Sequence, residues 1–280
     1  MTGSSALAHR VGELRAQLES LGDLRPCDTV DALFTELVEL CCATPPVVAE
    51  AAMSGLDAHA PALQGLCASG ESALEAHWAR RIVESDDPRA ELDRFPYLDN
   101  YRDLVRMELG MVTAMSRPWP ARVAVLGSGP LPLTGLILAE DFGAEVLHVD
   151  RDVGSLGLGD AVATALGVPR VAAGVRADLE QPSSASILLD AGLGRCDVVV
   201  LAALAGQDAT AKRTISGLLA RLLHDDALVL VRSAVRMRRL LYPQVRAEDL
   251  TGLRVALEVH PYTDIVNSVL VAHPGREGDT

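Results

Sequence analysis

Residues 123–140 read VAVLGSGPLPLTGLILAE: an apolar run, a Gly-Ser-Gly turn and a second apolar run. This order predicts a β-strand that ends in a tight turn and continues into a helix, as a nucleotide-binding unit begins. Gly127 and Gly129 flank the turn, where glycine permits a positive φ and close approach of the backbone to a ligand. Pro132 suits the first turn of the helix and Gly143 its C-cap.

The dinucleotide motif has a third glycine where this chain has Pro132, so the turn is poorly suited to a pyrophosphate. Asp150 ends the next predicted strand, at the usual interval for an acid that accepts both ribose hydroxyls. Asp178, after the third predicted strand, is a candidate for the adenine amino group. The alternatives are a tight turn without a ligand, a helix cap at Asp150 and a cap or turn at Asp178. S-adenosylmethionine has no phosphate, and an acidic chain suits its positive charge, so we expect this ligand at the turn.

The composition excludes several classes of function. The net charge of −13 argues against a nucleic-acid partner. No apolar run reaches the length of about 18 residues that a membrane helix needs, and the N-terminus lacks a secretion signal. The five cysteines are odd in number and the histidines are scattered, so we expect no disulfide framework, no metal requirement and a cytoplasmic location.

The spacing of apolar residues along the chain changes near residues 116–122. Before this point the apolar spacing predicts helices over about 7–21, 30–41, 61–84 and 101–112. After it, β-rich runs alternate with helical runs. The predicted strands are Val123–Leu126, Val146–Val149, Val171–Val175, Val198–Leu201, Leu228–Val231, Val255–Val259 and Ile265–Val271.

Five alternating strands followed by a hairpin-like pair predict a doubly wound sheet that ends in an antiparallel strand. This ending is typical of Rossmann-like S-adenosylmethionine-dependent methyltransferase folds. We therefore expect an α/β protein with an N-terminal α-helical domain over 1–119, acting as a lid on the acceptor side, and a Rossmann-like S-adenosylmethionine-binding domain over 120–280.

Six stretches, in order along the chain, are similar to the nicotianamine synthase family. They are LCASGESALEAHWARRI (66–82), FPYLDNYRDL (95–104), VAVLGSGPLPLTGLILA (123–139), DVVVLAALAG (197–206), LVRSAVRMRRLLYPQV (230–245) and VHPYTDIVNSVL (259–270). The resemblance implies transfer of the 3-amino-3-carboxypropyl (aminobutanoyl) group of S-adenosylmethionine to an amine, with release of methylthioadenosine. Plant and archaeal members condense such units into nicotianamine, and bacterial relatives place one on histidine on the way to opine-type metallophores. Histidine and S-adenosylmethionine-derived intermediates both stay open as acceptors.

Glu71 and Glu75 are the candidate catalytic acids. The acceptor is an ammonium at neutral pH and must lose a proton before it attacks, which a nearby carboxylate can bind and remove. The two glutamates lie four residues apart on a predicted helix, and neither has a basic partner at helical spacing. The alternative is a pair of solvated glutamates. The resemblance favours Glu71 as amine ligand and base, with Glu75 second.

Tyr97 and Tyr101 lie where a loop enters a helix, and a tyrosine hydroxyl can orient an amine or a carboxylate. The resemblance makes Tyr97 the better catalytic candidate. For Tyr101 a core aromatic is favoured, with substrate contact as the other possibility. The further candidates are, for the donor, Gly127, Ser128, Gly129, Pro130, Asp150, Asp178, Leu201, Ala202 and Ala203, and for the substrate, Ser233 and Tyr242; His260 and Asn267 also lie in family-like motifs.

Three positions carry further expectations. We interpret Lys212 as a surface lysine on a helix. Val235 and Arg236 stand where the family has a histidine and a glycine, and we expect this change to border the cavity and affect the acceptor. The segment after Asp150 is glycine-rich for the helix expected there. Two other functions stay open: a small-molecule methyltransferase, and a non-catalytic sensor of S-adenosylmethionine or a metallophore.

Overall fold

The strand that enters the glycine turn lies within a seven-stranded sheet. The computed structural model describes residues 3–261 and 263–275. β1 (Arg122–Leu126) pairs in parallel with β2 (Glu145–Asp150) on one side and β4 (Val198–Leu201) on the other. The remaining strands are β3 (Val175–Arg176), β5 (Leu228–Ser233), β6 (Leu253–Val259) and β7 (Ser268–Pro274).

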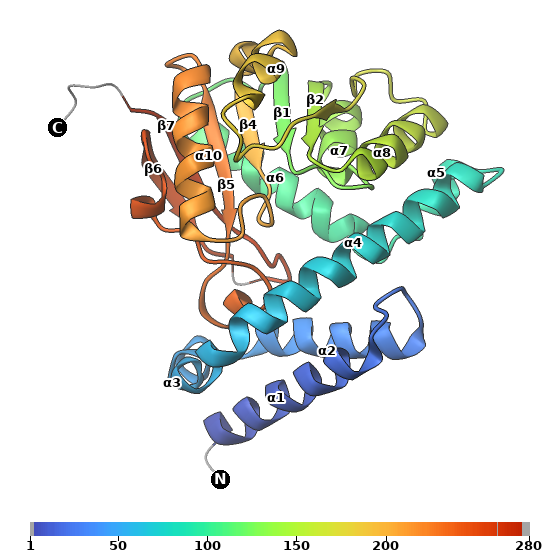
Figure 1. Ribbon diagram of the computed structural model, residues 1–280, viewed down its shortest axis with the longest axis vertical. Helices are drawn as coiled ribbons and strands as arrows, with labels where there is room; N and C mark the ends of the chain where they lie inside the picture. Colours follow the sequence, from blue (N-terminus) through green and yellow to red (C-terminus); the bar gives the residue numbers. More distant parts are fainter. Residues whose placement is uncertain (1–2, 262, 276–280) are drawn as a thin grey trace.

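The strand order is β3-β2-β1-β4-β5-β7-β6, and β7 runs antiparallel to both of its neighbours (Figure 1). The predicted doubly wound sheet with an antiparallel ending is therefore confirmed, and with it the Rossmann-like methyltransferase fold.

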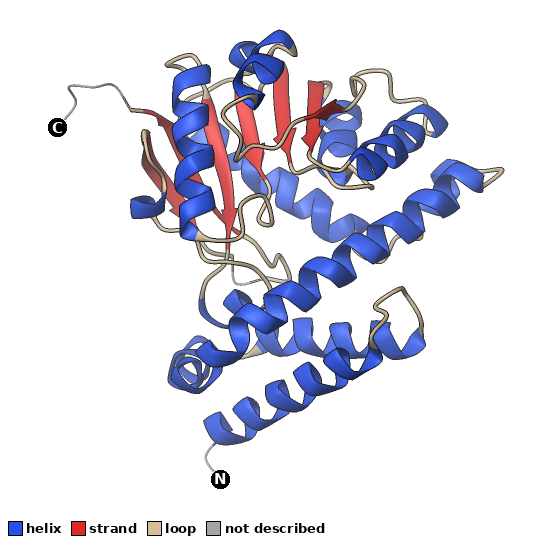
Figure 2. Cartoon of the chain, viewed as in Figure 1, coloured by secondary structure: helices blue, strands red, loops and turns tan. Residues whose placement is uncertain are grey.

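Helices cover both faces of the sheet (Figure 2). In β1, Val123 and Val125 pack into one core with α6 and α7, while Ala124 and Leu126 pack into a second core on the opposite face. This accounts for the continuous apolar run, since a parallel strand covered on both faces has no polar side. The helices that follow or cover the sheet are α6 (Leu98–Ala114), α7 (Leu133–Phe142), α8 (Val153–Ala165), α9 (Ser184–Asp190) and α10 (Ala209–Leu222).

A third core lies among the N-terminal helices. Val11, Leu14 and Leu18 of the first helix belong to it, and so do Met237 and Leu240 of η3 (Arg236–Leu240), a segment that follows β5. α4 runs between this helical layer and the sheet (Figure 1). The elements of this part are α1 (Gly3–Leu21), α2 (Asp28–Ala43), α3 (Pro46–Leu56), η1 (Asp57–His59), α4 (Ala60–Glu84) and α5 (Pro88–Leu92); two further short helices are η2 (Leu193–Arg195) and η4 (Ala247–Asp249). The division at 119/120 stays a prediction.

All seven predicted strands are found, and two of them differ most from the prediction in their bounds. The third is shorter: an isolated bridge joins Val146 to Val171, and β3 itself begins at Val175. The backbone N–H of Gly174 donates to the carboxylate of Asp160 at 2.8 Å rather than to a strand, which interrupts the pairing. The last strand begins at Ser268 instead of Ile265.

The ends of two helices follow from local sequence. Gly143 caps α7 with a φ of 72°, as predicted, whereas Pro132 stands just before the helix instead of in its first turn. α8 forms in spite of its glycines, and Asp152 caps it by accepting from the N–H of Ser155 at 2.6 Å.

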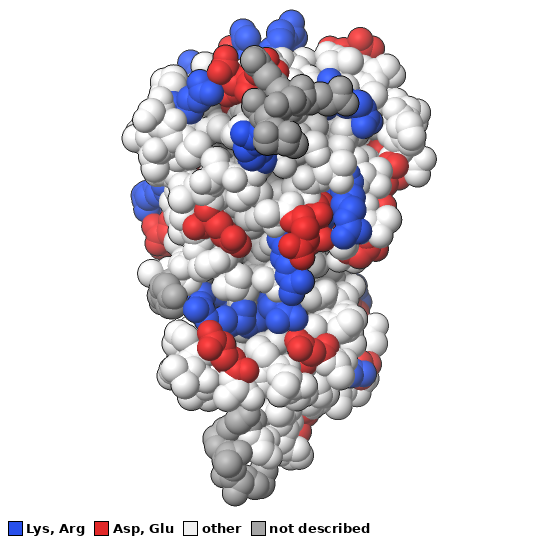
Figure 3. All heavy atoms as spheres, turned by 90° about the vertical axis from the view of Figure 1, so that its left-hand side faces the viewer, with Lys and Arg blue, Asp and Glu red and all other residues white. Residues whose placement is uncertain are grey.

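One face of the molecule carries charged side chains of both signs among uncharged residues (Figure 3). On the face shown in Figure 3, acidic and basic side chains lie next to one another instead of gathering by sign. None of the helices within residues 3–261 and 263–275 combines the length and apolar character that crossing a bilayer requires.

Candidate active site

A pocket of about 500 Å³ lies at the carboxyl ends of β1, β2 and β4, where open α/β sheets bind ligands. Its wall on the sheet side includes the glycine turn, Asp150 and Asp178, and its opposite wall includes Glu71 and Glu75 of α4. The pocket therefore joins the two parts of the chain in which the sequence predicts a donor site and an acceptor site.

The glycine turn has the backbone that its sequence predicts. The φ angles of Gly127 and Gly129 are 79° and 67°. The N–H groups of Gly127 and Ser128 donate to the carbonyl of Val149 at 2.8 and 3.1 Å, which ties the turn to β2. A Cβ on Gly127 would stand 3.0 Å from the methyl group of Ala205, so the turn and the loop after β4 close on each other.

Asp150 connects the turn to the start of α8. Its Oδ2 accepts from the N–H of Gly129 at 3.0 Å, and its Oδ1 accepts from the N–H of Asp152 at 3.0 Å. Asp152, and not Asp150, caps the helix. Each Asp150 oxygen keeps a lone pair for a ligand hydroxyl. Asp178 also lines the pocket, while its Oδ1 accepts from the N–H of Glu180 at 3.1 Å.

A buried polar chain supports the turn from below. The hydroxyl of Ser128 lies 3.3 Å from Nδ1 of His148, and Nε2 of His148 lies 3.0 Å from the carboxylate of Asp160. His148 is fully buried on β2, and Asp160 belongs to α8. These hydrogen bonds connect Ser128, the middle residue of the turn, to β2 and to α8.

On α4, Glu71 and Glu75 meet two tyrosines from distant segments. The hydroxyl of Tyr101 lies 3.3 Å from Oε1 of Glu71 and 3.3 Å from Oε1 of Glu75. The hydroxyl of Tyr242 donates to Oε2 of Glu71 at 3.0 Å. Because a tyrosine has one O–H, Tyr101 donates to one carboxylate and can accept from the other when that one is protonated.

Burial changes the proton affinity of this cluster. It raises the pKa of Glu71, which the hydrogen bonds from Tyr242 and Tyr101 oppose. Burial and the charge of Glu71 raise the pKa of Glu75 well above its ordinary value. Burial likewise raises the pKa of Tyr101 and of Tyr242, so both hydroxyls keep their protons at neutral pH. The cluster has the character of a general base that can also store a proton.

Lys212 is not the surface residue that the sequence predicts. It is 2% exposed, and its Nζ donates to the carbonyls of Ala202, Ala203 and Ala205 at 3.4, 3.3 and 2.6 Å. These carbonyls belong to the loop after β4, so the lysine anchors this loop through its backbone. Burial lowers the pKa of Lys212 to about 7.

Three predicted site residues lie outside the pocket wall. Leu201 is fully buried in the sheet core. The hydroxyl of Ser233 donates to the carbonyl of Val245 and accepts from its N–H, so it is buried and engaged with the backbone of that residue. Tyr97 packs on Phe95, and its hydroxyl lies near Thr35.

The remaining predicted site residues line the pocket: Glu71, Glu75, Tyr101, Gly127, Ser128, Gly129, Pro130, Asp150, Asp178, Ala202, Ala203 and Tyr242. Of the two tyrosines, Tyr101 lines the pocket and Tyr97 does not, contrary to the expectation that favoured Tyr97, and the catalytic role of either stays a prediction. Asn267 also lines the pocket, but Val235 and Arg236 do not, so that departure does not border the cavity as expected.

The sequence reading missed a buried ion pair. Nε and Nη2 of Arg232 donate to the two carboxylate oxygens of Glu108 at 2.8 and 3.1 Å, and Nη2 also donates to Oγ1 of Thr134 at 2.9 Å. Arg232 lines the pocket. A signal was present: an arginine ends a fully apolar strand, and a glutamate lies on the apolar face of a helix. A buried charge without an opposite partner is strongly destabilising, so each of the two residues predicts a partner of opposite charge.

Within the described residues, no group of three or more His, Cys, Asp and Glu side chains could hold a metal ion.

Known proteins are similar to this chain over nearly its whole length. The family described as "Nicotianamine synthase protein" matches residues 1–277. Nicotianamine synthase 2 of Oryza sativa subsp. japonica is 36% identical over 283 residues, covering 98% of this chain and 85% of the relative. Nicotianamine synthase of Solanum lycopersicum is 31% identical over 271 residues, covering 96% and 84%.

Among solved structures, MtNAS in complex with MTA and tNA has a TM-score of 0.82 at 23% identity, covering 96% of this chain and 98% of that one. A glutamate-to-glutamine variant of MtNAS in complex with S-adenosylmethionine has a TM-score of 0.79 at 24% identity, covering 95% and 97%. The fold is therefore shared over nearly the whole length.

Proposed function

The chain belongs to the nicotianamine synthase family, and from this we propose that it is an S-adenosylmethionine-dependent transferase. The group transferred is the 3-amino-3-carboxypropyl group, the acceptor is an amine, and the released nucleoside is methylthioadenosine. The observation that supports this most strongly is the Glu71, Glu75 and Tyr101 cluster, which opens into the same pocket as the glycine turn and Asp150.

The residues around the turn fit the donor. Asp150 offers acceptors to the ribose hydroxyls, and Asp178 offers one to the adenine amino group. Six acids but only two arginines are among the described lining residues, which suits a sulfonium. The acids are Glu71, Glu75, Asp150, Asp152, Asp178 and Glu180, and the arginines are Arg151 and Arg232.

The cluster on α4 fits the acceptor. Glu71 binds the ammonium and takes its proton, and the hydroxyl of Tyr242 holds the carboxylate in place. The free amine then attacks the carbon that joins sulfur to the amino-acid tail. The bond from this carbon to sulfur breaks, and its electron pair neutralises the sulfonium. Burial, which raises the pKa of Glu71, makes it a stronger base than an exposed glutamate.

We propose successive transfers toward nicotianamine as the first candidate sequence, since the relatives compared above are nicotianamine synthases. A single transfer to histidine, as in opine-type metallophore synthesis, is the second. A cytoplasmic location belongs to the same proposal, because all five cysteines are free thiols that suit a reducing compartment.

The test incubates the purified protein with S-adenosylmethionine alone and with histidine or other amino acids, and follows nucleosides and products by mass spectrometry. We expect methylthioadenosine together with aminobutanoyl adducts. Release of S-adenosylhomocysteine instead would replace the proposal by a methyltransferase. Binding without either nucleoside would indicate a sensor.

Glu71→Gln tests the base. The variant should bind S-adenosylmethionine normally but lose about two to four orders of magnitude in rate, the usual contribution of a general base. Glu84→Gln, at the exposed end of the same helix, is the matched control and should keep the wild-type rate. A Glu71→Gln enzyme with full rate would exclude Glu71 as the base.

A further inference from the structure

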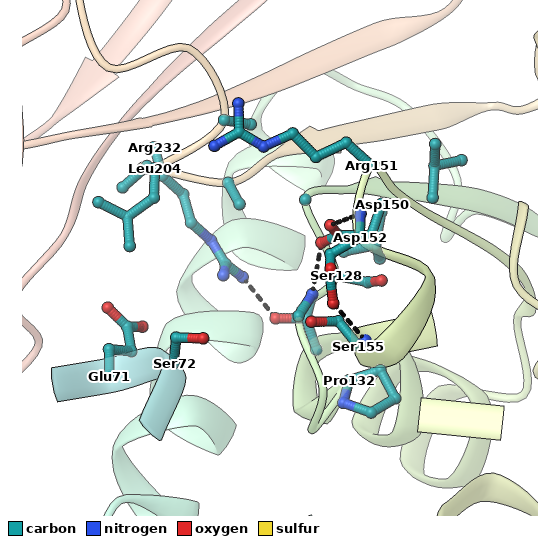
Figure 4. Close-up of a pocket in the computed structure, with 18 of the residues that line it drawn as sticks. Glu71, Ser72, Ser128, Pro132, Asp150, Arg151, Asp152, Ser155, Leu204 and Arg232 are labelled. Atoms are coloured by element: carbon teal, nitrogen blue, oxygen red, sulfur yellow. Dashed lines mark hydrogen bonds between the residues drawn. The ribbon is translucent and has the colours of Figure 1, made fainter. Parts of the chain in front are cut away.

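Arg232 is an unusual group for this pocket. Of the two arginines among its described lining residues, Arg151 is exposed, whereas Arg232 is 6% exposed. Figure 4 shows its side chain reaching toward the space between Glu71 and the turn that carries Ser128. The carboxylates of this pocket suit cationic groups of a ligand. A buried cation such as Arg232 suits an anionic group instead, so its role differs from theirs.

The guanidinium of Arg232 is fixed, and one of its nitrogens is left over. Nε and Nη2 bond Glu108 and Thr134, which accounts for three of its five N–H groups. Nη1 makes no hydrogen bond to the described residues. Glu108 thus sets the plane of the group, while two N–H donors stay available on its remaining edge.

Asn267 supplies a second unused donor in the same wall. Its Nδ2 is shielded from solvent and has no hydrogen-bond partner among the described residues, and its side chain lines the pocket. A shielded amide without a partner costs free energy unless a ligand satisfies it.

The pairing of β5 with β7 brings the two donors to the same end of the sheet. Arg232 pairs with Val269 across β5 and β7, and Asn267 lies two residues before Val269. Asn267 immediately precedes β7, whose first residue, Ser268, pairs with Ser233, so Arg232 and Asn267 lie at the same end of this strand pair and line the same pocket.

We propose that Nη1 of Arg232 and Nδ2 of Asn267 form a carboxylate site, which binds the α-carboxylate of an amino-acid substrate. The inference rests on the proposed function and adds the anchor for the non-reacting end of the substrate. An amino acid carries both charges: α4 binds the ammonium and the Arg232–Asn267 pair binds the carboxylate. The carboxylate is that of the S-adenosylmethionine tail or that of the acceptor.

The test compares ligands that differ only by this carboxylate. Titration calorimetry measures S-adenosylmethionine against decarboxylated S-adenosylmethionine, and steady-state kinetics compares histidine with histamine as acceptors. We expect the wild type to prefer the carboxylate-bearing member of one pair by about 10- to 100-fold, as one or two charge-assisted hydrogen bonds would give. The pair that shows the preference identifies the source of the carboxylate.

Two variants remove the site by different routes. Asn267→Leu leaves the ion pair intact, and Arg232→Met combined with Glu108→Gln removes the cation without leaving a buried charge unpaired. Both should reduce the preference at least several-fold and keep the affinity for methylthioadenosine, which has no carboxylate. Arg106→Met, an exposed arginine on α6, is the matched control and should keep the preference.

Two outcomes would overturn the site: a wild type with no preference in either pair, or variants that keep it in full. The proposed transfer reaction is judged separately by the nucleoside released. If S-adenosylhomocysteine is the product while the variants still lose the preference, the carboxylate site stands and the transfer reaction does not.

Discussion

Glu75 lies directly against Gly129: a Cβ on Gly129 would stand 2.5 Å from Oε2 of Glu75. The acid of α4 and the turn after β1 are therefore in van der Waals contact, although 54 positions separate them (129 minus 75). The two walls of the pocket, one from α4 and one from the glycine turn, are therefore fitted to each other at this point.

Gly129→Ala tests this fit. The φ of 67° costs an L-residue about 1–2 kcal/mol, and the methyl group also displaces a buried carboxylate. Gly143→Ala is the control, because its φ of 72° brings the same strain with nothing within 4 Å of the added methyl. In urea denaturation Gly129→Ala should lose more stability than Gly143→Ala, and it alone should bind S-adenosylmethionine more weakly. Equal losses and unchanged binding would argue against the contact.

Glu75→Gln should change how stability depends on pH. The pKa of Glu75 is raised in the folded protein, so the unfolded chain releases this proton first as pH rises. The free energy of unfolding therefore falls from the ordinary carboxyl range up to the folded pKa, and glutamine removes this loss. Denaturation should be measured at pH about 5 and about 8. The free energy of unfolding of Glu75→Gln, relative to that of the wild type, should be higher at the upper pH, while that of Glu84→Gln should change with pH as the wild type does. Parallel curves for Glu75→Gln and wild type would contradict the raised pKa.

Lys212 is the only lysine in the chain, so its titration can be observed without interference. Lysine labelled with ¹³C marks one side chain, and its Cε resonance should titrate near pH 7, where burial places the pKa. Between this value and the ordinary lysine pKa the unfolded chain holds more protons, so stability should rise with pH over that window. A resonance that titrates near the ordinary value would show a solvated amine.

Lys212→Met should remove that rise in stability. It should also weaken S-adenosylmethionine binding, because the loop after β4 loses three hydrogen bonds. Arg221→Met, exposed near the end of the same helix, controls for loss of a cation from α10. Unchanged binding by Lys212→Met would show that the loop does not need this anchor.

Arg236 has a φ of 52°, at the position where the family resemblance has a glycine. The left-handed backbone explains that glycine, and the arginine is strained there by about 1–2 kcal/mol. Arg236→Gly should therefore raise the free energy of unfolding by about 0.5–1 kcal/mol after the greater flexibility of glycine is allowed for. Arg239→Gly, within the same short helix η3, should lower it. A loss of stability in both variants would contradict the strain.

The sequence predicted those parts of the site that local patterns encode. The glycine turn, Asp150 and the pair Glu71 and Glu75 are each defined within one strand–turn or one helix, and the structure brings them into one pocket. The topology followed from the alternation of strands and helices, whereas β3 was overestimated because Gly174 bonds a side chain from α8.

The missed features depend on contacts between distant residues. Arg232 and Glu108 lie 124 positions apart, and neither segment indicates which partner the other has. Tyr97 and Tyr101 differ for another reason. Tyr97 precedes α6 with a non-helical backbone and faces Thr35 of α2, whereas Tyr101 lies one turn into the helix and faces α4. The choice between them depends on the packing of α6, which no local pattern encodes.

The third hydrophobic core has a consequence for synthesis of the chain. Its early members come from α1, but Met237, Leu240 and Leu241 complete it. A ribosome delivers these residues only after all six N-terminal helices and five strands have emerged. We therefore expect the N-terminal helices to stay incompletely packed during most of translation, with their apolar faces exposed to chaperones, and to complete their packing late although they are made first.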